Sequence, residues 1–228
     1  HCDTRILETT FDGQTPDHRW QDALNALPAS NIKPRFFDTR SETMIDQVID
    51  RIPKKLQAKR IILGSGYFEA PNTKGDTLIS KIEKKLKTRL DIEAKRDLVL
   101  NPESCQGIAD QAKKLASDGW RLRGPKSDGS TRKLHAKFML LTAHDAPKKI
   151  GKSFLYLGSG NFSKKGFAST VRGGNLEAGL VLQPNEDLTW RKGTRNNIQA
   201  LLPVNLDTCV EIGNLANGND YQEPEPPA

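Results

Sequence analysis

The sequence predicts an α/β domain, in which a layered, mixed β-sheet is flanked by helices on both faces. Two observations lead to this expectation. Short apolar runs that end at glycine or polar residues alternate along the chain with amphipathic stretches, the order typical of layered α/β folds. The length of 228 residues is also enough to bury a sizeable core.

Helices are expected where apolar residues recur every three to four positions. Such patterns cover residues 41–52, 75–90, 102–119 and a short stretch near 195–202. Ser41 is a candidate cap for the first of these helices. Pro102 and Gly119 stand where the third helix would start and stop.

Strands are expected in the short runs rich in β-branched and other apolar residues, namely 60–68, 92–101, 120–124, 133–143, 153–160 and 176–183. Two of them end alike, in "IILGSGYF" (61–68) and "LYLGSGNF" (155–162). A strand followed by a glycine turn is common, so we interpret this match as coincidence. The domain is expected over 41–212, after an irregular segment 1–40 and before a Pro- and Glu-rich tail 213–228.

The positive charge of the chain is concentrated in one segment. Between Arg121 and Lys165 there are eleven Lys or Arg residues and two acids, a net charge of +9, whereas the whole chain carries +7. The rest of the chain is therefore slightly acidic, at −2. Such a segment suits a polyanion, either nucleic acid or an anionic lipid surface. Solvated lysines on loops would give the same count.

The three cysteines, Cys2, Cys105 and Cys209, are far apart and form no CxxC pair. This spacing argues against a disulfide scaffold and against a cysteine-based zinc site, and it fits a reducing, cytoplasmic compartment. No apolar run approaches the roughly 20 residues that cross a bilayer. The sequence therefore predicts neither a transmembrane segment nor a bound cofactor.

The predicted strand "KLHAKFMLLTA" (133–143) carries a histidine and a lysine among core residues. Side chains alternate between the two faces of a strand, so His135 and Lys137 share one face and lie roughly 7 Å apart. The opposite face, which begins with Leu134 and Ala136, is apolar. The two polar side chains are therefore expected to point into the same volume.

A second group of polar residues follows the strand "SFLYLGSG". Its glycine turn allows close approach of a ligand to the backbone. Ser159 supplies a hydroxyl and Asn161 supplies amide donors beside that turn. Glu177, at the start of the next apolar strand, is an acid that would accept a proton from a histidine ring and fix its tautomer.

These motifs resemble those of the phospholipase D superfamily, whose signature is HxK, an aspartate after four intervening residues, and a downstream GSxN. His135 to Lys137 matches HxK, and Gly158 to Asn161 matches GSxN. "NLEAG" is similar to the Asn-x-Glu segment of the family's nuclease branches. The motif core covers residues 133–181, with a compatible order of elements from about residue 41. Thr142 departs from the pattern, because it stands where the aspartate would be.

The resemblance implies a metal-independent phosphodiesterase that works through a phosphohistidine. His135 would be the nucleophile, and Lys137 and Asn161 would hold the non-bridging phosphate oxygens. Ser159 would help to position the site, and Glu177 would orient the histidine. The family site uses two HxK motifs, and this sequence has one. Either two copies of the chain form a homodimer, or a second half lies beyond residue 228.

DNA is the expected substrate, because the basic segment suits a phosphate backbone and the Asn-x-Glu segment resembles the nuclease branch. With 6% aromatic residues the chain offers few platforms for base stacking, which favours recognition of the backbone. Two alternatives stay open. One is a phospholipid hydrolase or transferase of the same superfamily, and the other is a non-catalytic nucleic-acid-binding module that kept the fold.

Overall fold

The computed structural model describes residues 35–102, 107–125, 134–145, 149–184, 187–191, 197–204, 206–212 and 215. The chain divides into one unit of residues 1–34 and another of residues 35–228. All described residues belong to the second unit. The predicted tail lies outside the described residues apart from its Leu215, and so do most of the segment 1–40 and residues 126–133 and 146–148.

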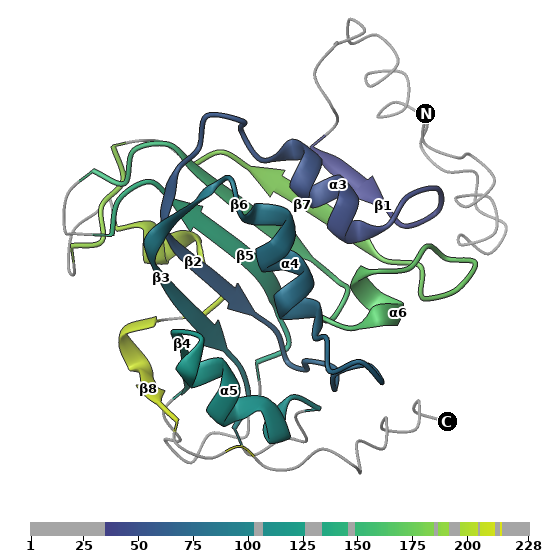
Figure 1. The fold of residues 1–228 in the computed structure, drawn as a ribbon. Helices are drawn as coiled ribbons and strands as arrows, with labels where there is room; N and C mark the ends of the chain where they lie inside the picture. The colour runs from purple at the N-terminus through teal and green to yellow at the C-terminus, as the bar shows by residue number, and fades with distance from the viewer. Residues whose placement is uncertain are drawn as a thin grey trace, which may run out of the picture. The chain divides into compact units, whose positions relative to one another are not determined.

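Eight strands form one mixed sheet in the order β1-β7-β6-β5-β2-β3-β4-β8 (Figure 1). They are β1 (Phe36–Asp38), β2 (Ala58–Gly64), β3 (Leu90–Val99), β4 (Trp120–Pro125), β5 (Lys137–Thr142), β6 (Ser153–Gly158), β7 (Ala178–Leu182) and β8 (Cys209–Glu211). The neighbours β2, β3 and β4 run parallel, and all other pairs are antiparallel. The predicted mixed sheet is therefore confirmed.

The two faces of the sheet have different covers. The helices are α3 (Met44–Arg51), α4 (Leu78–Leu86), α5 (Ala112–Ser117) and α6 (Lys164–Phe167), with the 3-10 helices η1 (Ala109–Gln111), η2 (Ile198–Leu201) and η3 (Leu206–Thr208). Apolar residues of all four α-helices belong to the larger core cluster on one face, and Figure 1 shows these helices in front of the sheet. On the other face, Ile198 and Leu206 bring η2 and η3 onto the smaller cluster. None of the described helices is long and apolar enough to cross a membrane.

Local differences from the sequence expectations have simple causes. Residues 36–38, expected to be irregular, form the edge strand β1 because they pair with β7. The first helix is capped by Thr43 rather than Ser41, since the Thr43 hydroxyl accepts a hydrogen bond from the Asp46 amide at 3.3 Å. The third helix is shorter than expected, with α5 covering only Ala112–Ser117 of the described part.

The residue pairing between neighbouring strands shows which strand ends lie together at one end of the sheet. Gly64 at the end of β2 lies opposite Val99 on β3 and Phe138 on β5. Lys137, at the start of β5, lies opposite Gly158 at the end of β6. Gly158 in turn lies opposite Gly179 on β7. The chain segments that leave β2, β3 and β6, and those that enter β5 and β7, therefore meet at this end.

Tyr156 packs beneath this end of the sheet. A Cβ on Gly158 would lie 1.8 Å from the Tyr156 Oη, and one on Gly179 would lie 2.7 Å from its ring. The two glycines thus leave the space that the tyrosine ring fills. Its hydroxyl is buried and has no hydrogen-bond partner among the described residues. Burial, followed by the nearby Glu177 carboxylate, raises the pKa of Tyr156.

Replacing Tyr156 by phenylalanine should therefore leave stability unchanged or increase it. The change keeps the ring, which contacts Phe37 and Phe167, and removes a buried hydroxyl that makes no bond within the described residues. Tyr156→Ala, the control, should lower the free energy of unfolding by about 3–5 kcal/mol, as truncations of buried aromatic residues do. Urea unfolding of the three proteins provides the comparison. A large loss in Tyr156→Phe would show that the hydroxyl has a partner after all.

Candidate functional site

The residues of the HxK and GSxN motifs gather at the end of the sheet defined above. His135 and Lys137 stand immediately before and at the start of β5, and Ser159 and Asn161 follow β6. Because β5 and β6 are antiparallel neighbours with Lys137 opposite Gly158, the two motifs are held side by side. Glu177 precedes β7, the next strand along. All five predicted site residues are thus in the same region of the fold.

His135 and Lys137 contact each other directly. The Lys137 Nζ lies 3.3 Å from the His135 Nε2. An ammonium group has donors only, so a charged Lys137 donates to an unprotonated Nε2, and the ring proton is then on Nδ1. His135 is exposed, whereas Lys137 is 4% exposed. Burial lowers the pKa of Lys137, and the Glu177 carboxylate opposes this effect.

Asn101 fixes the backbone in front of His135. Its side chain donates to the Leu134 carbonyl at 2.9 Å and accepts from the Leu134 amide at 2.8 Å. The amide of Asn101 is itself mostly buried, at 8% exposure. Sequence reasoning missed this residue, which closes the predicted strand 92–101. The signal that could have indicated Asn101 is its position as a polar residue at the end of an apolar strand.

Sequence reasoning also missed Ser65, although this residue lies in the first of the two matching Gly-Ser-Gly turns. β2 and β6 both run antiparallel to β5, so their turns leave the same end of the sheet. The Ser65 hydroxyl lies 2.8 Å from the Tyr67 carbonyl and 3.2 Å from the Asn161 Oδ1. The hydroxyl has one hydrogen, so it donates to one of these oxygens at a time. When it donates to Oδ1, the Asn161 amide group is the end that can donate to a ligand. The Phe68 and Phe162 rings stack at 5.3 Å beside this contact.

Glu177 has other partners than the predicted one. Its carboxylate accepts hydrogen bonds from the Ser159 hydroxyl and, at 3.2 Å, from the Asn175 side chain. Its backbone amide donates to the buried Thr39 hydroxyl at 2.9 Å. No bond joins Glu177 to His135 within the described part of the chain. The carboxylate therefore positions Ser159 in this structure, rather than orienting the histidine of the same chain.

Thr142, which replaces the aspartate of the motif, is fully buried at the far end of β5. Its hydroxyl donates to the His144 carbonyl at 2.8 Å. The hydroxyl at this buried position is thus hydrogen-bonded, and no charge is buried there. Asp145, the nearby acid, forms ion pairs with Arg60 and Lys95. Both residues lie at the opposite end of β5 from Lys137.

Exposed cations lie beside the site, together with the carboxylates of Glu177 and Glu69. Lys164 and Lys165 of α6 are exposed, three and four residues beyond Asn161. The Lys165 carbonyl accepts from the Asn175 amide, so this helix adjoins the loop that carries Glu177. No group of three or more His, Cys, Asp or Glu residues that could hold a metal ion is found among the described residues. Four basic residues of the charged segment, Lys126, Arg132, Lys133 and Lys148, lie outside the described residues.

No family model and no curated protein sequence matches this chain. Solved structures similar to it include yeast tyrosyl-DNA phosphodiesterase, with 11% identity and a TM-score of 0.45 over 70% of this chain and 51% of the enzyme. Polyphosphate kinase from Porphyromonas gingivalis is similar over 72% of this chain and 23% of the kinase, with 11% identity and a TM-score of 0.36. The yeast structures belong to the phospholipase D superfamily. At such identities and TM-scores, function does not follow from the likeness.

Replacing Lys137 by methionine should stabilise the fold. The folded protein has a lowered Lys137 pKa, so between the folded and the ordinary value the unfolded chain binds this proton more tightly. Wild-type stability thus rises with pH through that window. The advantage of Lys137→Met should be full below the folded pKa and should disappear as the pH rises to the ordinary lysine value of about 10.4.

Urea unfolding of both proteins at several pH values from neutral upward measures this difference. Lys84→Met is the control, because Lys84 is exposed on α4. A Lys137→Met protein that is less stable at neutral pH would mean that the contacts of the ammonium group outweigh its desolvation.

Proposed function

We propose that this chain is a metal-independent phosphodiesterase that cleaves DNA through a phosphohistidine intermediate. The observation that supports this proposal best is the meeting of the HxK and GSxN motifs at one end of the sheet. The register that pairs Lys137 with Gly158 brings His135 and Lys137 beside Ser159 and Asn161. A nucleophile and several donors for phosphate oxygens are thus held on neighbouring segments.

His135 begins the proposed reaction. A phosphate oxygen takes the Lys137 ammonium as its donor, which releases the Nε2 lone pair that Lys137 occupies in the resting site. Nε2 then forms a bond to phosphorus while the bond from phosphorus to the leaving oxygen breaks. A second histidine protonates that oxygen. In the second step, water loses a proton to this histidine and displaces His135 from phosphorus.

Lys137 and Asn161 stabilise the charge on the phosphoryl group. Lys137 is buried, and a cation acts more strongly on nearby charge in a site of low dielectric. Asn161 presents its amide group when the Ser65 hydroxyl donates to its Oδ1. Ser159 is held by Glu177 and also accepts from the Ala178 amide at 3.0 Å. In this scheme Glu177 is a positioning residue.

The second histidine comes, in this proposal, from another HxK motif. A second copy of the chain would supply it by placing two His135 residues on opposite sides of one phosphate. A second half beyond residue 228 would do the same.

DNA is the proposed substrate because exposed cations lie beside the site. Exposed Lys164 and Lys165 on α6, with exposed Arg172 in the following loop, offer contacts to phosphates on either side of the reacting one. A phospholipid is the second candidate. The observation that favours it is the exposed Leu176, at 58%, directly before Glu177.

Cleavage in excess EDTA tests the proposed chemistry. Wild-type protein should cut plasmid DNA, and His135→Ala should lower the rate by about 10³-fold or more, because it removes the nucleophile. His144→Ala is the matched control, since exposed His144 bonds through its backbone carbonyl. Phospholipid vesicles in the same assay test the second candidate. DNA binding by all three proteins without cleavage would leave a binding module.

Mixing experiments test whether a second copy completes the site. When wild-type chain is co-refolded with a tenfold excess of His135→Ala, cleavage should fall about tenfold, because most wild-type chains are then in mixed dimers. An excess of His144→Ala should leave the activity of the mixture at or above that of wild type. Sedimentation should give the mass of a dimer. A monomer whose activity is insensitive to the variant would contradict the two-copy site.

A further inference from the structure

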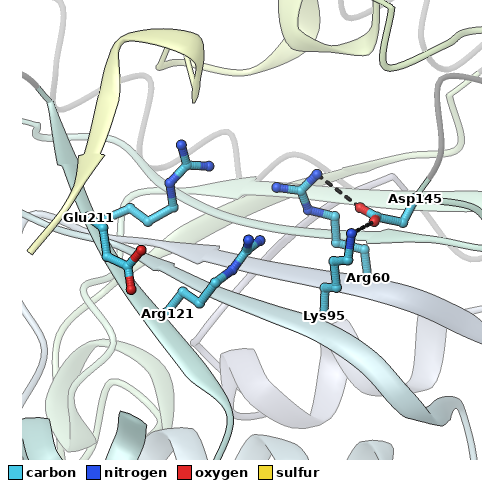
Figure 2. Close-up of a pocket in the computed structure, with 6 residues that line it drawn as sticks. Arg60, Lys95, Arg121, Asp145 and Glu211 are labelled. Atoms are coloured by element: carbon cyan, nitrogen blue, oxygen red, sulfur yellow. Dashed lines mark hydrogen bonds and ion pairs between the residues drawn. The ribbon is translucent and has the colours of Figure 1, made fainter.

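A pocket of about 350 Å³ lies away from the site described above. Its lining side chains are all charged: Arg60, Lys95, Arg121, Arg123, Asp145 and Glu211. Figure 2 shows Arg60 and Lys95 bonded to Asp145 on one side, with Arg121 and Glu211 on the other. We call this group the basic pocket. Its volume is in the range of small-ligand sites, and its lining offers charge rather than apolar surface.

The basic pocket is separate from the catalytic candidates. Arg60 lies on the sheet face of Ile62, a residue of the smaller core cluster, whereas Lys137 shares the face of Met139, a residue of the larger one. The pairing of Arg60 with Thr142 is four residues along the strands from that of Gly64 with Phe138. At about 3.4 Å per residue this is about 14 Å. The two sites therefore occupy opposite faces of the sheet and different ends of its strands.

Neighbouring strands align the pocket's side chains. Arg60 on β2 lies opposite Lys95 on β3, and Arg123 on β4 lies opposite both Val99 on β3 and Glu211 on β8. Arg121 lies opposite Asp97, which is fully buried. Because paired residues point to the same face, the cations converge on one area.

Buried Asp97 forms ion pairs with two of the arginines and is hydrogen-bonded to Arg60. Its Oδ2 lies 2.8 Å from the Arg60 Nη2, and its Oδ1 lies 2.7 Å from the Arg121 Nη2. The Trp190 ring also packs on the Arg60 guanidinium, 4.5 Å from centroid to Cζ. Fixed guanidinium groups lose little conformational entropy when they bind an oxyanion.

The cations outnumber the acids that neutralise them. Arg60 and Arg121 share Asp97, and Arg60 and Lys95 share Asp145. Arg123 donates to the carbonyls of Leu206 and Cys209, which carry no charge. Glu211 forms no ion pair with the described residues. Arg121 is 43% exposed, so its remaining donors reach solvent. Arginine forks of this kind match the geometry of phosphate oxygens.

We propose that the basic pocket is a second oxyanion site, which binds a phosphate group outside the catalytic centre. The phosphate belongs either to a nucleic-acid backbone or to a free phosphate ligand. Both sources present the same chemistry to Arg121 and Arg123. The charged lining recognises the phosphate and offers no platform for a base.

Titration of the full chain with inorganic phosphate at constant ionic strength tests the proposal. Backbone amide NMR signals of Arg121 and Glu211 should shift and saturate. Arg121→Gln should weaken this binding at least tenfold, whereas Glu211→Gln, which removes the opposing charge, should tighten it several-fold. Lys84→Gln, which removes a charge on α4, should leave it unchanged. If Arg121→Gln unfolds because Asp97 loses this partner, the affinity of Glu211→Gln still tests the proposal.

Titration with a DNA oligonucleotide identifies the source of the phosphate. If it is a backbone phosphate, Arg121→Gln should also weaken DNA binding and reduce its salt slope by about 1. If only inorganic phosphate responds to the variants, the ligand is a free phosphate. The absence of a saturable shift at both amides, or equal affinities in wild type, Arg121→Gln and Glu211→Gln, would overturn the proposal. Neither titration requires cleavage, so both are independent of the proposed function.

Discussion

The placement of β5 between β2 and β6 is the constraint on which the candidate site depends. Both contacts are antiparallel, so the start of β5 meets the ends of its two neighbours. Every polar residue of the site lies at the end of a strand or next to it at that edge. A shift of β5 by one residue would turn Lys137 to the opposite face and Phe138 toward the site. The apolar side chains that fix this register therefore also fix the chemistry.

Much of this arrangement was predictable from local pattern. Short apolar runs gave the strands, and alternation placed His135 and Lys137 together because it depends on neighbouring residues alone. The contacts that sequence reasoning missed join distant segments. Ser65 reaches Asn161, and Asn101 reaches Leu134, only because β2, β3, β5 and β6 are neighbours in the sheet. Nothing in the spacing of those residues specifies that order of strands.

The expected role of Glu177 and the basic segment both depend on the position of each strand in the sheet, which the sequence pattern does not specify. Glu177 precedes β7, two strands away from β5 and about 9–10 Å from it. Ser159 follows β6, the strand between them. Its hydroxyl therefore donates to the Glu177 carboxylate, which was expected to orient His135. The basic segment is likewise divided by the sheet. Arg121 and Arg123 point to one face, whereas Lys164 and Lys165 belong to α6 on the other. A run of charge in the sequence is thus not one patch in the fold.

The protein presents positive charge in two physically different ways. Arg60 and Arg121 of the basic pocket share buried or partly buried carboxylates, which offset the cost of crowding like charges. Lys137 has no ion pair with the described residues, and its desolvation is opposed only by the more distant Glu177. A desolvated cation destabilises the empty site but interacts strongly with a phosphate that replaces the missing counter-charge. The cost in stability at Lys137 and its proposed action on the substrate therefore have one origin.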